Sequence, residues 1–481
     1  MTTANPAALW PLIVMGAAPV VIMLVVAFYR HHGVTAVLTL ISFVLAFTTL
    51  PGVSSLTSRE IAPLLLLDDY ALFYMGLLFA ASFVVAALSY SYLERHEGNR
   101  EEFYILLLLA TLGSAVLVAS SHFASFFLGL EILSVSLYCL IAYPRRDPYG
   151  IEGGIKYLVL AGVSTAFLLF GMALIYAELG TMELGRMILL QTMAGDAHRL
   201  MLLTGLAMII VGIGFKLAVV PFHLWTPDVY EGAPAPVTAF VATVSKGSMF
   251  ALLVRYFTQV DLHLYRSLFL VFGLIAIASM FVGNLLALLQ TNVKRVLAYS
   301  SIAHLGYLLV AFLAGGASVV TAITFYLTAY FITTLTAFGI ITVLSSRARD
   351  ADALEDYRGL FWRHPWLAGI FTAALLSLAG IPLTAGFIGK FYILAAGIES
   401  ALWLPVIILV VNSAIGLFYY LRIVIALYTY PPPEAEVSRV APSLSLAGSL
   451  VLAALTLLLV WLGVYPAPLI HAIQTTIASL L

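Results

Sequence analysis

The chain has 481 residues, of which 63% are hydrophobic and only 9% are charged. Soluble domains carry about a quarter charged residues, so this composition excludes an ordinary soluble protein and indicates that the bilayer surrounds most of the chain. The formal net charge of −1 gives no reason to expect a nucleic-acid partner. The single cysteine, Cys139, excludes an iron–sulfur cluster or a structural zinc site held by several cysteines of this chain.

The remaining composition offers no cofactor site. The ten histidines are scattered along the chain, and no phosphate-binding loop of the Walker or Rossmann type occurs. We therefore expect no haem, no metal and no other cofactor in this chain.

Apolar stretches long enough to cross a bilayer recur along the whole sequence. The first has no basic residue before it, which argues against a cleaved signal peptide. At about 20 residues per crossing, we expect an all-α polytopic membrane protein with about 14 transmembrane helices. After a first helix within residues 1–32, they are expected at about 33–54, 70–92, 103–120, 121–142, 155–179, 200–222, 235–257, 267–288, 296–315, 318–345, 365–400 (broken), 403–428 and 445–465.

Basic residues in the connections predict the orientation. If both termini are outside, on the periplasmic side, thirteen basic residues fall in cytoplasmic connections and five in outer ones, as the positive-inside rule favours. The inner group is Arg30, Arg95, Arg100, Arg145, Arg146, Lys294, Arg295, Arg347, Arg349, Arg358, Arg363, Arg422 and Arg439, and the outer group is Arg59, Arg186, Arg199, Arg255 and Arg266.

The other four lysines, Lys156, Lys216, Lys246 and Lys390, fall in apolar stretches, whereas Lys294 is expected in a connection. A lysine at membrane depth costs about 2.5–3.5 kcal/mol on insertion scales, so such residues usually serve transport. A buried ammonium can release its proton, whereas a guanidinium stays protonated, so lysine suits a proton relay. The alternative is that a lysine reaches an interface with its long side chain, which stays open for Lys156 and is least compatible with Lys246.

Two of these lysines stand beside proline breaks. Lys216 precedes Pro221, and Lys390 follows Pro382 in LSLAGIPLTAGFIGKFYIL. Proline interrupts a helix, and irregular backbone at membrane depth survives only beside protein or water, so both breaks indicate an ion pathway. The reversed order of proline and lysine is what an inverted repeat would produce.

Glu131, in FFLGLEILSVSLY, is the acidic counterpart in the membrane. A nearby ammonium would keep it charged, and the alternative is a neutral carboxyl bonded to backbone or hydroxyl groups. His304, in SSIAHLGYLLV, could bridge the two broken segments, because histidine titrates near neutral pH. A hydrogen-bonded core histidine is an equally good interpretation of His304.

Four stretches carry a family resemblance: PFHLWTPDVYEGAPAPVTAF, FLGLEILS, GNLLALLQTNVKRVLAYSSIAHLGYLL and LSLAGIPLTAGFIGKFY. They are similar to the antiporter-like membrane subunits of proton-pumping NADH:quinone oxidoreductase, respiratory complex I, and the resemblance covers nearly the whole chain. PFHLWTPDVY, where other members would read closer to PFHTWLPDAH, favours one branch of that family.

The resemblance implies two inverted five-helix repeats, each with a broken helix, and a hydrophilic axis in the middle of the membrane. By matching motifs, Glu131, Lys216, Lys246 and Lys390 carry proton translocation, with Lys156 and His304 as possible further relays. The implied domains are 1–102 (three helices), 103–258 (first repeat), 259–430 (second repeat) and 431–481 (C-terminal helix).

The resemblance further implies a bacterial inner membrane protein whose partners are other complex I membrane subunits, protons and lipid. The complex would use NAD, quinone, flavin and iron–sulfur clusters, all bound in other subunits. Two alternatives remain: a subunit of a multi-chain sodium/proton antiporter, and a structural spacer that pumps nothing.

Overall fold

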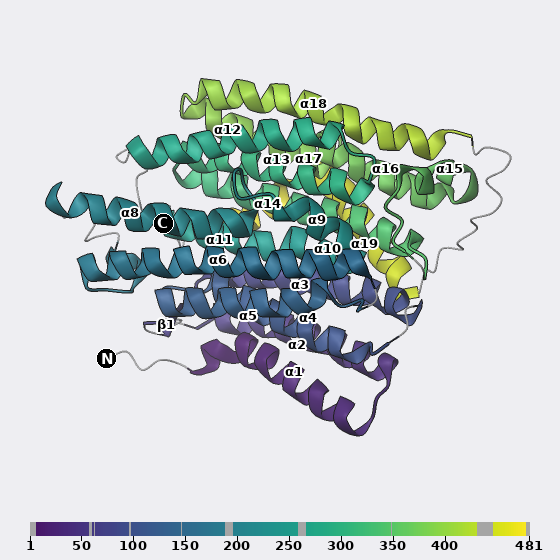
Figure 1. The fold of residues 1–481 in the computed structure, drawn as a ribbon, viewed down its shortest axis with the longest axis horizontal. Coiled ribbons are helices and arrows are strands. Elements are labelled where there is room, and N and C mark those ends of the chain that lie inside the picture. Colours follow the sequence, from purple (N-terminus) through teal and green to yellow (C-terminus); the bar gives the residue numbers. More distant parts are fainter. Residues whose placement is uncertain are drawn as a thin grey trace.

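The computed structural model describes residues 6–56, 60–61, 63–95, 98–145, 147–187, 196–257, 266–347, 349–430 and 446–477. Within these residues the chain is almost entirely helical, and most helices run side by side in one bundle (Figure 1). β1 (Glu60–Ile61) and β2 (Leu65–Leu66) form a short antiparallel pair.

Thirteen described helices are long and apolar enough to cross a membrane, which confirms the expected all-α membrane fold, and the shorter α16 and α17 lie where a broken helix was expected. The first part of the bundle contains η1 (Pro6–Leu9), α1 (Trp10–Phe28), α2 (His32–Ser54), α3 (Asp69–Arg95), α4 (Glu101–Val118), α5 (Phe123–Ile141), α6 (Pro148–Leu179) and α8 (Asp196–Leu217).

The rest of the chain continues the bundle past α8. It contains α9 (Trp225–Gly232), α10 (Ala235–Phe240), η2 (Val241–Ser245), α11 (Lys246–Phe257), α12 (Arg266–Leu288), α13 (Val293–Ala314), α14 (Ala317–Leu344), η3 (Leu354–Tyr357), α15 (Leu360–Arg363), α16 (Pro365–Ala379), α17 (Ala385–Glu399), α18 (Trp403–Tyr428), α19 (Leu446–Val464) and α20 (Ala467–Ile477). The short α20 was not among the expected elements.

The helix α6 begins earlier than the sequence predicted. We expected a helix from about 155, but α6 starts at Pro148 because the Asp147 side chain accepts a hydrogen bond from the Tyr149 N–H and proline occupies the first turn. Lys156 therefore lies more than two turns inside the helix.

The centre of the bundle is formed by α10–α11, α13 and α14. The most apolar segments of α10–α11 and α13 are wholly buried, whereas those of α6 and α19 are 33% buried. Figure 1 places α1 at one edge of the bundle and α18 at the other, with α13 and α14 between them. The sequence therefore places polar residues on the helices that are least in contact with lipid.

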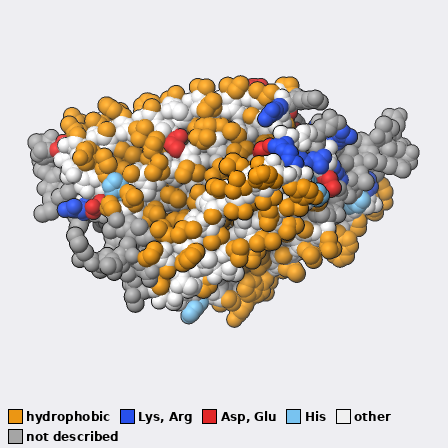
Figure 2. All heavy atoms as spheres, turned by 90° about the horizontal axis from the view of Figure 1, so that it is seen from below, with side chains coloured by type: hydrophobic (Ala, Val, Ile, Leu, Met, Phe, Trp, Pro, Cys, Tyr) orange, Lys and Arg blue, Asp and Glu red, His pale blue; other side chains and the backbone are white. Residues whose placement is uncertain are grey.

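Most of the described basic residues lie at one end of the helices, which we call the basic end. The Arg30–Glu102 ion pair, the Arg95 contact to the Ser345 carbonyl and the Lys294–Asp350 ion pair join its connections to one another. Figure 2 shows apolar side chains over most of one face, with Lys and Arg gathered mainly toward one end. Arg59, Arg146 and Arg439 of the predicted connections lie outside the described residues.

Candidate functional site: a buried row of lysines

Glu131 lies on α5 and is partly exposed at the side of the bundle. One of its carboxylate oxygens accepts a hydrogen bond of 3.0 Å from the Thr165 hydroxyl on α6. Ser134 follows one helical turn later on α5, is buried, and points the same way along the helix. The carboxylate and the Ser134 hydroxyl thus form adjacent polar positions on one helix.

Lys216 occupies the last turn of α8 and is 2% exposed. Its Nζ donates to Ser134 Oγ at 3.1 Å and to the Tyr157 hydroxyl at 2.8 Å. No ion pair joins Lys216 to Glu131, although both residues are described. Lys216 bonds a hydroxyl of α5 and one of α6, and Glu131 bonds another hydroxyl of α6. The positive charge also suits the C-terminal end of a helix.

The first break separates α8, which ends at Leu217, from α9, which begins at Trp225. Pro221 lies between them, and Ala218 has a positive φ of 60°. The Val220 N–H in this segment donates to Ser279 Oγ at 2.9 Å, and the Trp225 indole donates to the Phe215 carbonyl at 3.0 Å. Side chains thus satisfy backbone groups that a continuous helix would have paired.

Lys246 begins α11, directly after a π-helical turn at Val241–Ser245, a feature that is frequent at functional sites. The side chain is 1% exposed, and its Nζ donates to Ser301 Oγ on α13 at 2.7 Å. The rings of Tyr230 and Trp225, both on α9, lie 5.2 and 6.0 Å from Nζ. Lys246 therefore lies in the centre of the bundle and faces α9, the short helix that follows the first break.

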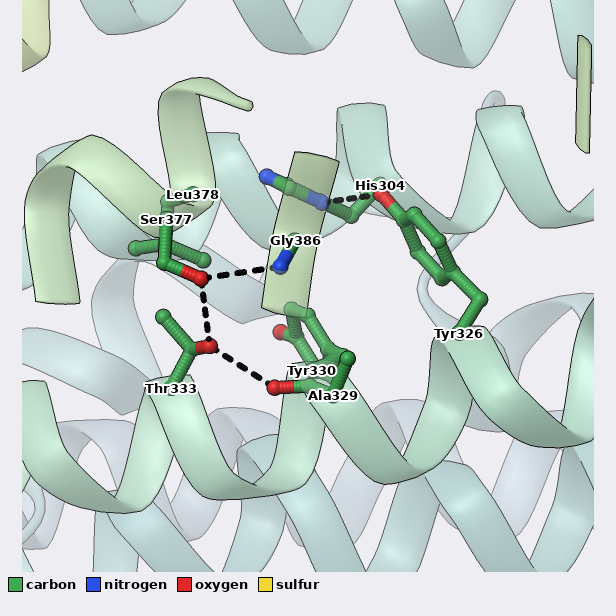
Figure 3. A pocket seen from close by; sticks show the side chains of 8 residues that line it. All are labelled: His304, Tyr326, Ala329, Tyr330, Thr333, Ser377, Leu378 and Gly386. Carbon is green, nitrogen blue, oxygen red and sulfur yellow. Dashed lines mark hydrogen bonds between the residues drawn. The ribbon is translucent and has the colours of Figure 1, made fainter. Parts of the chain in front are cut away.

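His304 is buried on α13 and contacts two tyrosines, of which Figure 3 shows Tyr326. Nδ1 lies 2.6 Å from the Tyr326 hydroxyl, and Nε2 lies 3.2 Å from the Tyr420 hydroxyl. A cavity of about 10 Å³ adjoins His304 and Tyr326, close to the space that one water molecule needs. Ser377 lines the same cavity, where its hydroxyl accepts from the Gly386 N–H at 3.1 Å.

Lys390 lies on α17, behind the second break. Its Nζ donates to the Leu378 and Ala379 carbonyls at the end of α16, at 2.9 and 2.8 Å, and to Ser413 Oγ on α18 at 2.9 Å. The Tyr307 ring on α13 lies 5.3 Å away. Pro382 lies between α16 and α17, so Lys390 stabilises free carbonyls at the end of an interrupted helix, whereas Lys216 at the first break bonds only hydroxyls.

Lys156 differs from these three lysines. Its side chain is 41% exposed and forms ion pairs with Glu152 at 2.7 Å and with Asp228 on α9 at 2.6 Å. Asp228 in turn binds Arg295 on α13 at 2.9 Å. The structure thus places Lys156 in a partly exposed ion network rather than among the buried lysines.

Lys294 corrects an expectation from the sequence. We expected it in a connection, but it lies in the first turn of α13 with a side chain that is 1% exposed, because the helix is capped by the Asn292 side chain and begins earlier than hydropathy indicates. Arg255, expected near an interface, is also buried and forms a bidentate pair with Asp68 at 2.6 and 3.0 Å.

Sequence reasoning missed the neutral partners of the lysines. Tyr157, Trp225, Tyr230 and Ser301 all lie in or beside the motifs and lysines that were singled out, but nothing in a single sequence distinguishes a buried tyrosine that bonds a lysine from one that only packs. The shared feature is chemical: in the described part of the chain, Lys216, Lys246 and Lys390 each bond neutral oxygens and none forms an ion pair.

Curated relatives share nearly the whole length of this chain. NADH-quinone oxidoreductase subunit N of Nitrosospira multiformis is 56% identical over 479 residues, covering 96% of this chain and 94% of that protein. NADH-quinone oxidoreductase subunit N of Methylococcus capsulatus is 47% identical over 482 residues, covering 98% and 95%.

Solved structures agree with this fold. A chain of respiratory complex I from Thermus thermophilus is 31% identical with a TM-score of 0.82, covering 96% of this chain and 99% of that one. A chain of the Mrp complex from Dietzia has a TM-score of 0.85 and covers 100% of this chain and 98% of that one, but at 20% identity it shows the fold alone. The family model for NADH:quinone oxidoreductase and Mrp antiporter transmembrane subunits matches residues 120–416. The chain belongs to this family of antiporter-like membrane subunits, and within it to the subunit N branch.

Proposed function

We infer that this chain is a proton-translocating membrane subunit of NADH:quinone oxidoreductase. The observation that supports this function is the bonding of the three buried lysines. Hydroxyl oxygens accept hydrogen bonds from an ammonium and donate them to a neutral amine, so each site suits either protonation state of its lysine. A carboxylate partner would instead hold the charged form.

We propose that Glu131 and Lys216 form the input of the path, Lys246 the central relay, and Lys390 the connection toward the outer side or a neighbouring subunit. The Thr165 hydroxyl bonds Glu131, and the Ser134 hydroxyl bonds Lys216. His304 and its two tyrosines belong to the same region, since His304 lies on α13, which contacts Lys246 through Ser301 and Lys390 through Tyr307. Lys156 is the weakest candidate for a relay, because its ion pairs hold it in the charged form.

The driving energy comes from outside this chain. Moving one elementary charge against 100 mV costs about 2.3 kcal/mol, and nothing in the buried row of lysines supplies that energy. We propose that redox chemistry in other subunits, which use NAD, flavin, iron–sulfur clusters and quinone, drives the transfer. The partners are then other complex I membrane subunits in a bacterial inner membrane, with both termini on the periplasmic side.

We also propose the division of the chain into helices 1–102, two inverted repeats at 103–258 and 259–430, and a C-terminal part at 431–481. One broken segment in each repeat supports this division, since α8 and α9 fall in the first and α16 and α17 in the second.

Gentle purification of the tagged chain tests the function against its alternative. We expect the chain to bring with it the subunits that oxidise NADH and reduce quinone, and the purified assembly in vesicles to pump protons when NADH and quinone are added. A chain that instead isolates with other antiporter subunits, and whose proton movement requires sodium, would be a sodium/proton antiporter component.

A further inference from the structure

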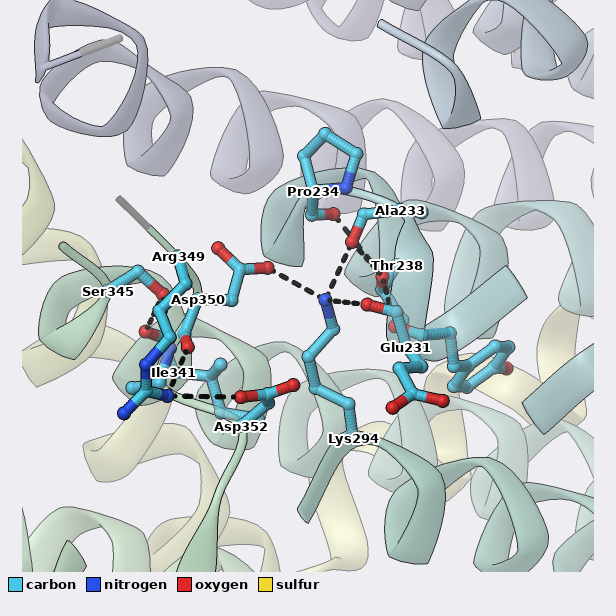
Figure 4. A network of polar contacts seen from close by, with 12 residues as sticks. Glu231, Ala233, Pro234, Thr238, Lys294, Ile341, Ser345, Arg349, Asp350 and Asp352 are labelled. Atoms are coloured by element: carbon cyan, nitrogen blue, oxygen red, sulfur yellow. Dashed lines mark hydrogen bonds and ion pairs between the residues drawn. The ribbon is translucent and has the colours of Figure 1, made fainter. Parts of the chain in front are cut away.

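Lys294 is a buried lysine that the proposed path does not use (Figure 4). Its Nζ donates to the Glu231 carbonyl at 2.8 Å, the Ala233 carbonyl at 2.7 Å and the Asp350 carboxylate at 2.7 Å. An ammonium has three N–H donors, so these three acceptors use all of them. One of the three acceptors is a carboxylate, which favours the charged form of the lysine, so Lys294 is a fixed charge rather than a group that exchanges its proton.

The position of Lys294 is electrostatically unfavourable without these partners. The first turn of a helix carries the positive end of the helix dipole, which repels a cation, and burial adds the cost of desolvation. Asp350 balances the charge, and its other oxygen accepts from the Tyr92 hydroxyl on α3 at 2.9 Å.

The two carbonyls bound by Lys294 lie at the C-terminal end of α9, the short helix after the first break. The same helix supplies Tyr230 and Trp225, whose rings face Lys246. Thr238 on α10 bonds the Ala233 carbonyl at 3.3 Å as well, so the turn that Lys294 binds also joins the segment leading to Lys246.

Lys294 itself lies on α13, seven residues or about two turns before Ser301. Ser301 provides the hydroxyl that accepts from Lys246 at 2.7 Å and lies 3.3 Å from the Tyr230 hydroxyl. Both α9 and α13 contact Lys246. Lys294 lies on α13 and bonds the C-terminal end of α9, so it joins these two helices. Arg295 joins the same two helices through Asp228 and Glu231, but its side chain is 24% exposed.

We propose that Lys294 is a positioning residue for proton transfer: its contacts to α9 hold the Ser301 hydroxyl of α13 in place against Lys246. This inference rests on the proposed function of Lys246. It assigns a role to the basic end of α13 that is separate from carrying protons.

The test uses the complete oxidoreductase in vesicles, with proton pumping and quinone reduction measured at matched amounts of assembled complex. Lys294→Met should lower pumping at least about tenfold, because displacements near 1 Å can cost that much or more. Ser301→Ala should also lower it. If Lys294 acts through Ser301, adding Lys294→Met to Ser301→Ala should lower pumping by less than about twofold further, a non-additive result.

A second variant separates positioning from folding. Lys294→Met leaves the Asp350 carboxylate buried without its cation, so Lys294→Met/Asp350→Asn should restore the amount of assembled complex but not its pumping. The matched control is Arg349→Met. It removes a cation that is 57% exposed and lies beside Asp350 in the connection after α14, and the variant should pump normally.

Three results would overturn the proposal: independent, multiplicative effects of Lys294→Met and Ser301→Ala; normal pumping by Lys294→Met/Asp350→Asn; or no assembled complex with either Lys294 variant, which would make the residue one of assembly alone. Normal pumping by Lys246→Met would overturn the proposed function instead. Loss in Lys246→Met with normal pumping in Lys294→Met would overturn this inference and leave the function standing.

Discussion

At the scale of single residues, the buried cations that the structure describes are of two kinds, which differ in their bonding partners. Lys294 and Arg255 each bind a carboxylate, whereas Lys216, Lys246 and Lys390 bind hydroxyls and carbonyls. A paired cation is held in its charged state, and breaking such a pair costs about 3–5 kcal/mol. The unpaired lysines have no such constraint, which is the property that a relay requires.

Replacing Lys246 by methionine tests the central relay. Methionine keeps the length and apolarity of the side chain and removes the amine, so α11 should insert as well as before. We expect proton pumping and quinone reduction to fall together by at least about tenfold, as for loss of an essential proton-transfer group.

The control for Lys246→Met is Arg363→Met, which removes an exposed cation at the basic end and should leave both rates unchanged. Normal pumping by Lys246→Met in a complex of normal abundance would favour a structural spacer over a pump.

At Glu131, three substitutions separate charge from hydrogen bonding. Glu131→Gln keeps an oxygen that can accept from Thr165 but removes the charge, and we expect proton pumping to fall clearly. Glu131→Asp keeps the charge on a shorter side chain and should do less harm. Thr165→Val keeps the carboxylate and removes only its hydroxyl donor, so it should cost the least.

Pumping against pH in vesicles, at matched assembly, distinguishes these variants. A profile for Glu131→Gln that coincides with that of the unmodified complex would contradict a role for the Glu131 charge.

At the scale of elements, the helix breaks depend on local backbone geometry. Gly380 ends α16 with a φ of 84°, a conformation that strains any residue with a side chain. A Cβ at this position would also lie 2.8 Å from Cδ of Lys390. The glycine thus serves both the turn and the lysine behind it.

Gly380→Ala should therefore destabilise the second break by about 1–3 kcal/mol and displace Lys390. We expect a lower thermal stability of the complex together with reduced pumping. Gly162→Ala is the matched control, because Gly162 lies inside α6, where a Cβ would meet no atom within 4 Å and alanine favours the helix. Equal behaviour of the two variants would contradict the constraint at Gly380.

Hydropathy and proline positions were sufficient to predict the membrane-crossing helices, the two interrupted segments and the buried Lys216, Lys246 and Lys390, because each depends on local sequence. They could not place Lys294, since its burial results from carbonyls and a carboxylate that are 56 to 63 residues distant along the chain. They also could not show that Glu131 and Lys216 bond separate hydroxyls of α5 and α6 rather than each other, because that depends on tertiary packing.

At the scale of the whole molecule, the charge asymmetry predicts how the bundle lies in the membrane. Arg347 is exposed in the connection after α14, at the basic end, whereas Gly185 is exposed at the opposite end with no atom within 4 Å of its added Cβ. In a Cys139→Ala background, Arg347→Cys should resist an impermeant thiol reagent applied from the periplasmic side, and Gly185→Cys should react. The reverse labelling pattern would invert the orientation.

If Lys390 carries protons as proposed, its nitrogen keeps three hydrogen bonds after the proton leaves. The charged lysine uses all three N–H groups, on two carbonyls and Ser413, and the Ser413 hydroxyl then lies 3.5 Å from the Ala379 carbonyl, toward which it can donate. A neutral amine has two donors and a lone pair, so the carbonyls can keep their bonds while the Ser413 hydroxyl rotates and donates to nitrogen. Rotation of the Ser413 hydroxyl, without movement of the helices, therefore suits the site to both the charged and the neutral lysine.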